Sequence, residues 1–384
     1  MGSFLNFVFL SDKIEKNGPD DISIAGPLFW YIFRIKKNEI SFTLNGKIKD
    51  GYKNILLIEG KCSLSSFENI PDYIIDFVKN NDVKLLATSL ADPSSAYSYV
   101  PAKRNLERLL PNKYFILDSN SSLEGCFTID YFLEESTFPQ FKHNKFGEIN
   151  VLGYISEEIK ISELDKQREK KFLSFNRTTD KHHRAALLHE YLINDYSDSY
   201  FSFINKLECL GSIPNVGDIR DNYDFYNSKL PIELDTQRVD NKNSFASYST
   251  FKKKLFLNSC INIVTETSFE NNELFVSEKI LKPILMYQPF IVIGPVGYLK
   301  YLRERYKFKT FSNFWDESYD DIEDYTDRVK VIIDLIRELN KKSIEEFNEI
   351  YQKTKDICIY NRELFDSFEL DSFPQIFKKI EDEW

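Results

Sequence analysis

Apolar runs of strand length alternate with stretches of helical periodicity along most of this chain. In the first part, the strand-like runs end in polar or glycine turns: NFVFLSD, YKNILLIEG, VKLLATSLAD and KYFILDSN. Helical spacing occurs between them in SFENIPDYIIDFVKNN and PAKRNLERLLPNK. Strands that alternate with helices favour a parallel sheet with helices on both faces, so this part predicts an α/β domain.

A second series with the same alternation begins near residue 171 and is followed by a helical tail. KFLSFNR, YFSFINK, PFIVIGP and the short FKTF are strand-like, and KHHRAALLHEYLINDY is helical. The charged stretch GYISEEIKISELDKQREKK before this series suits either a linker between domains or a solvated surface helix. We therefore predict two Rossmann-like domains with C-terminal helices, divided as 1–160, 161–335 and 336–384.

The bulk composition agrees with two packed domains and excludes several classes of protein. The chain has 384 residues, of which 42% are hydrophobic, which suits two domains of ~150 to 200 residues. A net charge of −10 without a long Lys/Arg run argues against nucleic-acid binding, although a few placed cations suffice for a phosphate ligand. No apolar run reaches the ~18 residues of a membrane span, and the N-terminus lacks the features of a signal peptide.

The cysteines and acids give weaker signals. Five scattered cysteines without a CxxC pair argue against a disulfide framework or a zinc site and favour a cytoplasmic location. Ligand sites of parallel sheets lie at the carboxyl ends of strands, which marks Asp92, Asp118 and Glu124 as candidates. For any one of these three acids, a role in forming a turn or capping a helix is the more common one.

A basic helix start follows the strand-like run KFLSFNR. The stretch SFNRTTDKHHR places Arg177, His182, His183 and Arg184 in a polar loop and the first helical turn. Free amides and cations at a helix N-terminus form an anion site, and cations there oppose the helix dipole unless an anion is bound. A solvated loop that happens to be basic has equal weight on spacing alone.

A second polar constellation follows in IVTETSFENNELFVSEKI. We expect a strand to end at Glu266, with Thr267 and Ser268 beside it, and a helix to begin near Ser277. A capping role explains Ser277 and an acid in the first turn, but it does not explain Lys279 near the positive end of the helix. Polar residues at a strand end and at the next helix start frame a crevice for a ligand.

Taken in order, these motifs resemble the donor domain of the α1,3/4-fucosyltransferases of glycosyltransferase family 10. The stretches are SFNR…HHRAALLHEYL, FKKKLFLNSCINIVTETSF and FVSEKILKPILMYQPFIVIG. They correspond to the family's arginine that opens a helix, its "FENS" strand, and its "YVTEK" helix leading to "PV..G". The resemblance covers about residues 171–311, and FVSEKI is its sharpest element. It implies the GT-B fold, in which two Rossmann-like domains face a cleft.

The resemblance implies a role for each matching residue. Arg184 matches the arginine on the donor diphosphate, and Glu266 matches the acid of the "FENS" strand and is expected, with Glu278, to bind the sugar and ribose of the donor. Phe275 stands where the family has an aromatic residue beside the guanine and sugar. Glu278 matches the carboxylate that binds donor hydroxyls, and Lys279 matches the cation on the phosphate.

The chain departs from the family in two places. Thr267 and Ser268 replace the family's Asn-Ser, and Phe275 lacks the hydroxyl of tyrosine. These changes leave the donor sugar and base open.

The sequence therefore predicts an inverting glycosyltransferase that moves a sugar, with L-fucose from GDP-fucose as one candidate, onto a glycan or glycolipid acceptor. Asp92 is the first choice for the base, with Asp118 and Glu124 as alternatives. We expect no cofactor and no metal, because acids such as those in DESYDDIED usually stabilise a helix start. A lipid-linked acceptor would make the cytoplasmic protein peripheral to a membrane. A different GDP-, UDP- or CMP-sugar donor, or a non-catalytic glycan- or nucleotide-binding protein, remains open.

Overall fold

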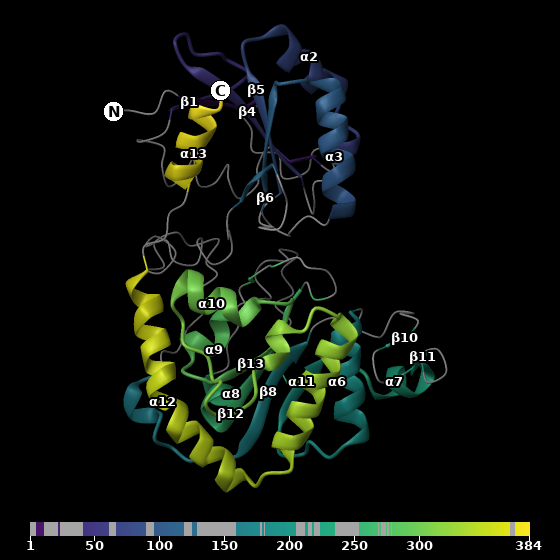
Figure 1. Ribbon diagram of the computed structural model, residues 1–384, viewed down its shortest axis with the longest axis vertical. Helices are drawn as coiled ribbons and strands as arrows, with labels where there is room; N and C mark the ends of the chain where they lie inside the picture. Colours follow the sequence, from purple (N-terminus) through teal and green to yellow (C-terminus); the bar gives the residue numbers. More distant parts are fainter. Residues whose placement is uncertain are drawn as a thin grey trace. The chain divides into compact units, whose positions relative to one another are not determined.

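The computed structural model divides the chain into two compact units (Figure 1). The first contains Met1–Glu135 together with Leu370–Trp384, and the second is Ser136–Glu369. The structure describes residues 5–10, 22–23, 41–60, 67–89, 96–118, 125–128, 159–176, 179, 181–204, 212–213, 217–218, 223–234, 253–267, 269, 274, 276–277, 279–368 and 373–384.

The first unit is built on a sheet with the strand order β3-β1-β4-β5-β6-β7. Neighbouring strands in this order are parallel, and β2 (Ile22–Ser23) adds antiparallel to β4. The strands are β1 (Leu5–Val8), β3 (Ser41–Thr43), β4 (Lys53–Gly60), β5 (Lys84–Ser89), β6 (Tyr114–Asp118) and β7 (Phe127–Thr128). The predicted parallel sheet is therefore confirmed for this unit.

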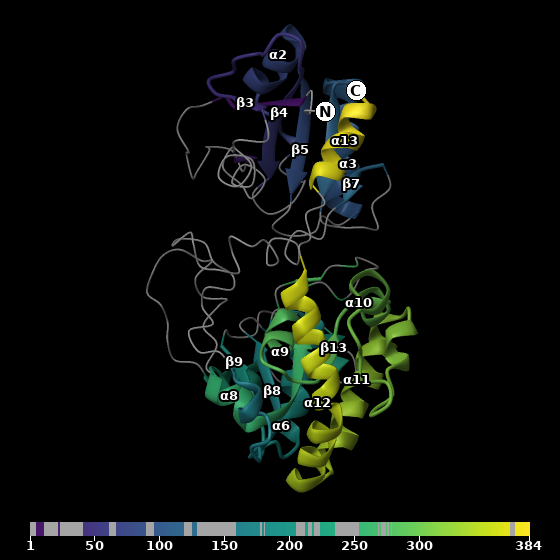
Figure 2. The same ribbon diagram turned by 90° about the vertical axis from the view of Figure 1, so that its left-hand side faces the viewer.

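Helices cover both faces of this sheet (Figure 2). Residues of α2 (Asp72–Asn80) and α3 (Ala96–Leu109) pack in one core with Val8, Leu56 and Ile58. The alternate side chains of the strands meet α13 (Phe373–Asp382), where the rings of Phe7 and Phe377 lie 4.9 Å apart. The run Ile55–Ile58 is buried on both faces, as a central parallel strand requires.

The second unit contains a four-stranded sheet with the order β13-β12-β8-β9. Its strands are β8 (Lys170–Asn176), β9 (Tyr200–Phe203), β12 (Ser259–Thr265) and β13 (Phe290–Ile293), and all neighbours are parallel. From β8 the chain adds β9 on one side. It then crosses back and adds β12 and β13, in that order, on the other side of β8. The direction of winding therefore reverses between β8 and β12, which is where an open α/β sheet forms its ligand crevice.

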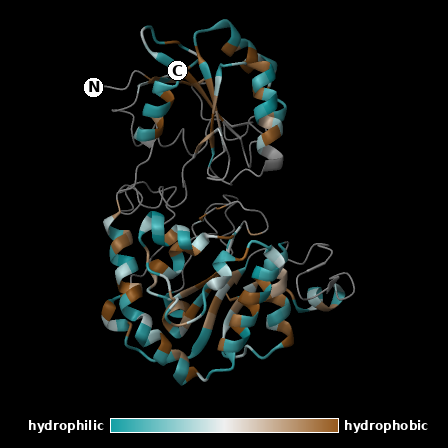
Figure 3. Ribbon diagram, viewed as in Figure 1, coloured by the Kyte–Doolittle hydropathy of each residue, from teal (hydrophilic) through white to brown (hydrophobic). Residues whose placement is uncertain are grey.

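The helices of this unit lie on both faces of the sheet. On one face α6 (His182–Ile193) contacts α11 (Tyr325–Asn340), and on the other α12 (Ile344–Ser367) contacts β8, β12 and α9 (Leu281–Leu285). Figure 3 shows that the strands are mainly hydrophobic and that the helices alternate hydrophobic and hydrophilic residues. The remaining elements are η3 (Ile161–Glu163), β10 (Ser212–Ile213), β11 (Gly217–Asp218), α7 (Tyr223–Lys229), α8 (Lys253–Asn258), α10 (Tyr298–Tyr306) and η6 (Ser318–Asp321).

Two local predictions are wrong. The helix expected near Ser277 begins only at Leu281. Its N-cap position is occupied by Ile280, and no side chain caps the helix. The short strand expected at FKTF is absent, because side chains satisfy its backbone groups instead of a sheet. The side chain of Asn361 bonds both the N–H and the carbonyl of Lys309. The Glu317 carboxylate accepts from the N–H of Phe311.

Candidate functional site

The candidate site lies at the carboxyl ends of β8 and β12, where the direction of winding reverses. The last residues of these strands are joined by a hydrogen bond, in which Thr265 Oγ1 donates to Asn176 Oδ1 at 2.7 Å. Asn176 Nδ2 in turn donates to Ser174 Oγ at 3.1 Å. All three side chains are buried. The segments that leave the two strands therefore start side by side.

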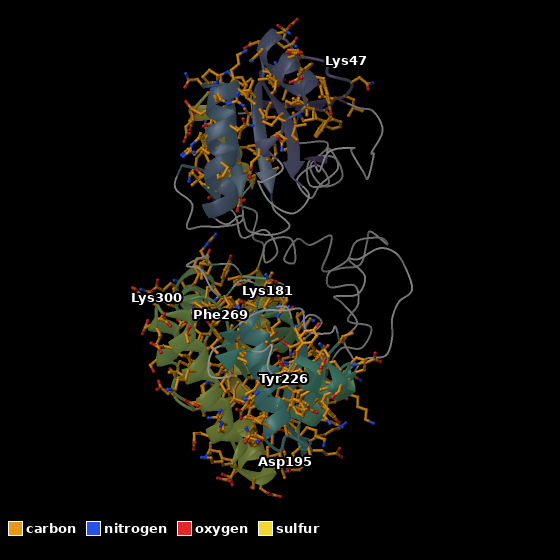
Figure 4. The ribbon with its side chains drawn as sticks, turned by 90° about the vertical axis from the view of Figure 1, so that its right-hand side faces the viewer. Lys47, Lys181, Asp195, Tyr226, Phe269 and Lys300 are labelled. Carbon is orange, nitrogen blue, oxygen red and sulfur yellow. The ribbon has the colours of Figure 1, made fainter. Side chains whose placement is uncertain are left out.

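The backbone carbonyl of Glu266 binds the start of α6 to the end of β12. It accepts a hydrogen bond from His183 Nε2 at 2.9 Å and another from Arg184 Nη2 at 3.1 Å. The first turn of α6 contains no acidic residue, and its N-cap Lys181 makes no side-chain capping bond. Figure 4 shows Lys181 and Phe269 at the same end of this unit, with Asp195 at the opposite end. The basic start of α6 is thus placed at the strand edge where a ligand is expected.

His183 is held as a neutral ring. Burial lowers its pKa well below the ordinary value, and the adjacent charge of Arg184 lowers it further. Because a carbonyl only accepts, Nε2 carries the proton and Nδ1 is left as an acceptor. Within the part of the chain that the structure describes, Nδ1 has no hydrogen-bond partner. The ring stacks on Phe269, with centroids 4.9 Å apart and planes 27° apart.

The carboxylate of Glu266 is fully buried and is surrounded by donors. Oε2 accepts from Ser277 Oγ at 2.5 Å and from the N–H of Thr267 at 3.3 Å. Oε1 accepts from Tyr298 O–H at 2.5 Å and from the N–H of Ser277 at 3.4 Å. Four donors satisfy the two oxygens, so this carboxylate ties together the segment after β12 and the first residue of α10.

Lys279 is positioned by the same network. Its ammonium donates to Thr267 Oγ1 at 2.9 Å and to Ser277 Oγ at 3.3 Å. The Lys279 N–H also donates to Ser277 Oγ at 3.3 Å, which gives Ser277 a role in a turn before α9 and not the predicted role as a helix cap. Lys279 is half-buried. The Arg184 guanidinium is therefore bonded directly to the backbone carbonyl of Glu266, and the Lys279 ammonium is linked to the Glu266 carboxylate through Ser277.

The structure brings together part of the set expected from the sequence. The expected residues that it gathers at this edge are His183, Arg184, Glu266, Thr267, Ser277 and Lys279. His182 is the first residue of α6, and the other candidates of this set lie outside the described residues: Arg177, Ser268, Phe275 and Glu278. Asn176, Phe269 and Tyr298 were not predicted. The only signal for Tyr298 is its place directly after the glycine turn GPVG that follows β13.

In the first unit, only one of the three acids proposed as a base is described. Asp118 ends β6, is fully buried, and lies level with Ser89 of β5 and Thr128 of β7. Burial and the charge of Asp118 raise the pKa of the nearby Cys126 thiol to about 12. Asp92 and Glu124 lie outside the described residues. The carboxyl edge of this sheet thus carries at least one buried acid.

The acidic run after residue 315 supports the ends of helices. Asp320 accepts from the N–H groups of Leu299 and Lys300, each at 2.8 Å, in the first turn of α10. Asp324 caps α11 by accepting from Thr326 and Asp327. Where residues are described, no group of three or more His, Cys, Asp or Glu side chains is arranged to hold a metal ion.

Comparisons with known proteins identify no family. No family model matches the chain, and no curated protein matches its sequence. Among solved structures, the chain is similar to a crystal structure of an α1,3-fucosyltransferase, with a TM-score of 0.35 and 9% identity. That match covers 96% of this chain and 91% of the other. At this TM-score the case for a function rests on the residues of the site. No helix among the described residues is long and apolar enough to cross a membrane.

Proposed function

We propose that this chain is an inverting glycosyltransferase of the GT-B type, which moves a sugar from a nucleotide-sugar donor to a hydroxyl of a glycan or glycolipid. The observation that carries the proposal lies at the reversal point of a parallel sheet: Arg184 is bonded to the Glu266 carbonyl, and Lys279 is linked to the Glu266 carboxylate through Ser277. L-Fucose from GDP-fucose is the donor that the motifs of the sequence favour. The proposed setting is the cytoplasm, where a lipid-linked acceptor would bring the protein to a membrane surface.

The diphosphate of the donor needs positive groups that are in place before the reaction. When the bond to the anomeric carbon breaks, negative charge develops on the leaving phosphate oxygen. We assign Arg184 and Lys279 to this diphosphate, since guanidinium and ammonium groups form strong charge-assisted hydrogen bonds with phosphate. The free amides at the start of α6 add to the same field. These groups supply the neutralisation that a metal supplies elsewhere, so the proposed reaction needs no metal.

Glu266 and Glu278 take different parts in this proposal. The Glu266 carboxylate already accepts four hydrogen bonds inside the protein, so we assign it to the positioning of Lys279 through Ser277. The hydroxyls of the donor are then left to Glu278, with Phe275 beside the base or sugar. The neutral His183 contributes an acceptor at Nδ1 and no positive charge.

The acceptor hydroxyl is activated by a carboxylate of the first unit in this proposal. The acceptor oxygen bonds to the anomeric carbon as the bond from that carbon to the diphosphate oxygen breaks, and the hydroxyl proton passes to the base. Asp92 remains the first choice, with Asp118 and Glu124 as alternatives. The Asp92→Asn variant is expected to bind nucleotide and to lose turnover, and unchanged turnover would remove Asp92 from the mechanism.

Nucleotide binding tests the proposal most directly. Thermal stability is measured with GDP, UDP and CMP, since a nucleotide that binds only the folded state raises the melting temperature. Lys279→Met is expected to weaken binding of the stabilising nucleotide by about 10- to 150-fold, which corresponds to one hydrogen bond to a charged group. The control is Lys330→Met, because Lys330 is exposed on α11.

The outcomes separate the transferase from its rivals. Release of nucleotide from a nucleotide sugar in the presence of EDTA supports a transferase that needs no metal. Binding without hydrolysis or transfer indicates a binding protein instead. Failure of all three nucleotides to stabilise the chain would count against the whole proposal.

A further inference from the structure

Arg328 is a buried guanidinium whose donors all go to backbone carbonyls. It lies in the first turn of α11 and is 1% exposed. Nε donates to the carbonyl of Gly294 at 3.2 Å, and Nη2 donates to that of Phe269 at 2.8 Å. Nη1 donates to the carbonyls of Ile322 and Glu323. Among the described residues, it forms no salt bridge with a carboxylate.

These four carbonyls belong to three separate segments. Phe269 follows β12, Gly294 follows β13, and residues 322–323 lie directly before α11. A planar guanidinium with donors in fixed directions holds several carbonyls in one geometry, which the single ammonium of lysine does not reproduce. Burial of a charge without a carboxylate partner is costly, and four carbonyl dipoles offset part of that cost. A protein can bear this free-energy cost where a loop must be held in a defined place.

Arg328 also forms one end of a stack that reaches the candidate site. Its guanidinium carbon lies 4.6 Å from the centre of the Phe269 ring, and that ring stacks on His183. His183 and Arg184 share the carbonyl of Glu266. Arg328 is therefore linked to Arg184 by a continuous series of contacts, which passes through Phe269, His183 and Glu266. The two arginines are nevertheless far apart in the sequence.

We propose that Arg328 is a positioning residue for the anion site at the start of α6: it fixes Phe269, which holds His183 and keeps the Glu266 carbonyl directed at Arg184. This inference rests on the proposed function for the identity of the ligand. Its structural part, the fixing of the segment after β12, stands on the contacts of Arg328 alone. Arg328 itself does not touch the ligand in this proposal.

The variant Arg328→Lys tests the inference, and Arg168→Lys is its matched control. Arg168 is also a buried guanidinium of this unit, is 2% exposed, and donates to the carbonyls of Phe256 and Ser259. It lies against the ring of Tyr351 at 3.5 Å, near the beginning of β12 and not near its end. Arg168→Lys loses two bonds to carbonyls and Arg328→Lys loses four, but both remove a buried guanidinium of this unit, and only Arg328 is linked to the proposed site.

Binding of GDP, UDP and CMP is measured by calorimetry at 25 °C, once thermal melting has shown that both variants are folded at that temperature. For the nucleotide that wild type binds, the dissociation constant is expected to rise roughly 2- to 30-fold in Arg328→Lys, because a residue that acts through a network of contacts changes the coupling by about 0.5–2 kcal/mol. Arg168→Lys is expected to stay within about twofold of wild type, since distant sites act independently. Phe269→Leu, which breaks the stack but keeps the carbonyl, is expected to weaken binding in the same way as Arg328→Lys.

Hydrogen exchange gives a readout that needs no ligand. Peptides that span residues 266–279 are expected to exchange faster in Arg328→Lys and to match wild type in Arg168→Lys. Equal exchange of this segment in both variants would overturn the inference. An unchanged dissociation constant in Arg328→Lys would also overturn it while the proposed function stands, whereas absence of nucleotide binding by wild type would overturn the proposed function and with it the assigned ligand.

Discussion

Replacement of Glu266 by glutamine is the sharpest test of the network at the end of β12. Glutamine has the same size and shape, but it is neutral and places an NH₂ group where one carboxylate oxygen now accepts. In the structure both oxygens face donors: the hydroxyls of Ser277 and Tyr298, and the N–H groups of Ser277 and Thr267. One amide position must therefore face a donor, whichever way the side chain is turned.

The expected loss of stability follows from these four bonds. A hydrogen bond to a charged group contributes about 1.5–3 kcal/mol and a neutral one about 0.5–1.5 kcal/mol, so the two short hydroxyl bonds lose roughly 2 kcal/mol together. A backbone N–H that faces the new NH₂ group costs about 1–3 kcal/mol more. Removal of a buried charge offsets part of the total, since the desolvation of the carboxylate disappears. We expect a net loss of about 2–4 kcal/mol.

Calorimetric melting measures this loss in Glu266→Gln. For a unit of this size, each kcal/mol lowers the melting temperature by about 2–4 °C, so the transition of the second unit should fall by roughly 5–15 °C. The control is Glu349→Gln on the exposed side of α12, where Lys353 is the only ion-pair partner of Glu349 among the described residues and the change should stay within about 2 °C. A melting temperature of Glu266→Gln as close to wild type as that of the control would refute the argument that the network needs the charge.

Three further predictions concern other parts of the structure. Because burial keeps His183 unprotonated when folded, only the unfolded state takes up its proton; stability should be full above about pH 6.5 and fall by up to about 1.4 kcal/mol per pH unit below it. Urea titrations at several pH values should show a smaller slope for His183→Asn than for wild type or His182→Gln. Phe377→Ala removes the contact of α13 with Phe7 and should destabilise the first unit by about 3–5 kcal/mol in calorimetric melting. Asp320→Asn keeps only one acceptor for the two N–H groups of α10 and should lower the stability of the second unit by about 1–2 kcal/mol in urea titrations.

These three predictions have distinct contrary results. An equal pH slope in His183→Asn and wild type would show that another group causes the acid loss. A melting transition of Phe377→Ala no lower than that of Tyr73→Ala, in which an exposed side chain of α2 is removed, would show that α13 adds nothing to the first unit. Burial raises the pKa of Asp320, which shows that the charged form is costly to bury. Wild-type stability of Asp320→Asn would mean that this cost cancels the benefit of the cap.

The parallel sheets and the position of the site were predictable because they depend on short stretches of chain. Strand-like runs that alternate with helical runs predict parallel pairing, and the strands β4, β8 and β12 lie where those runs occur. His183 and Arg184 were singled out because they open a helix after a strand-like run, and Lys279 because it lies near a predicted helix start after the next polar strand end. Local patterns suffice there because the carboxyl ends of parallel strands meet at one edge whatever the rest of the chain does.

The roles of these residues were less predictable than their positions. The sequence favoured Ser277 as a helix cap, but its hydroxyl bonds Glu266 and α9 begins later. The resemblance made Glu266 a ligand of the donor, yet in the structure four internal donors surround its carboxylate. The positions of Glu266 and Ser277 in the sequence do not show whether the Glu266 carboxylate is buried. Burial decides whether a carboxylate faces a ligand or the protein's own hydroxyls.

By itself, the sequence determined that the chain forms α/β units with parallel sheets and that basic side chains follow the strands near residues 176 and 265. Only the tertiary structure decided that Arg184 and Lys279 are linked to Glu266, one directly and the other through Ser277, that Arg328 contacts Phe269, and that α13 packs against β1. The reason is that periodicity reports which face of an element is apolar, whereas these contacts join residues far apart in the chain. Their geometry exists only after the sheet has brought its strand ends together.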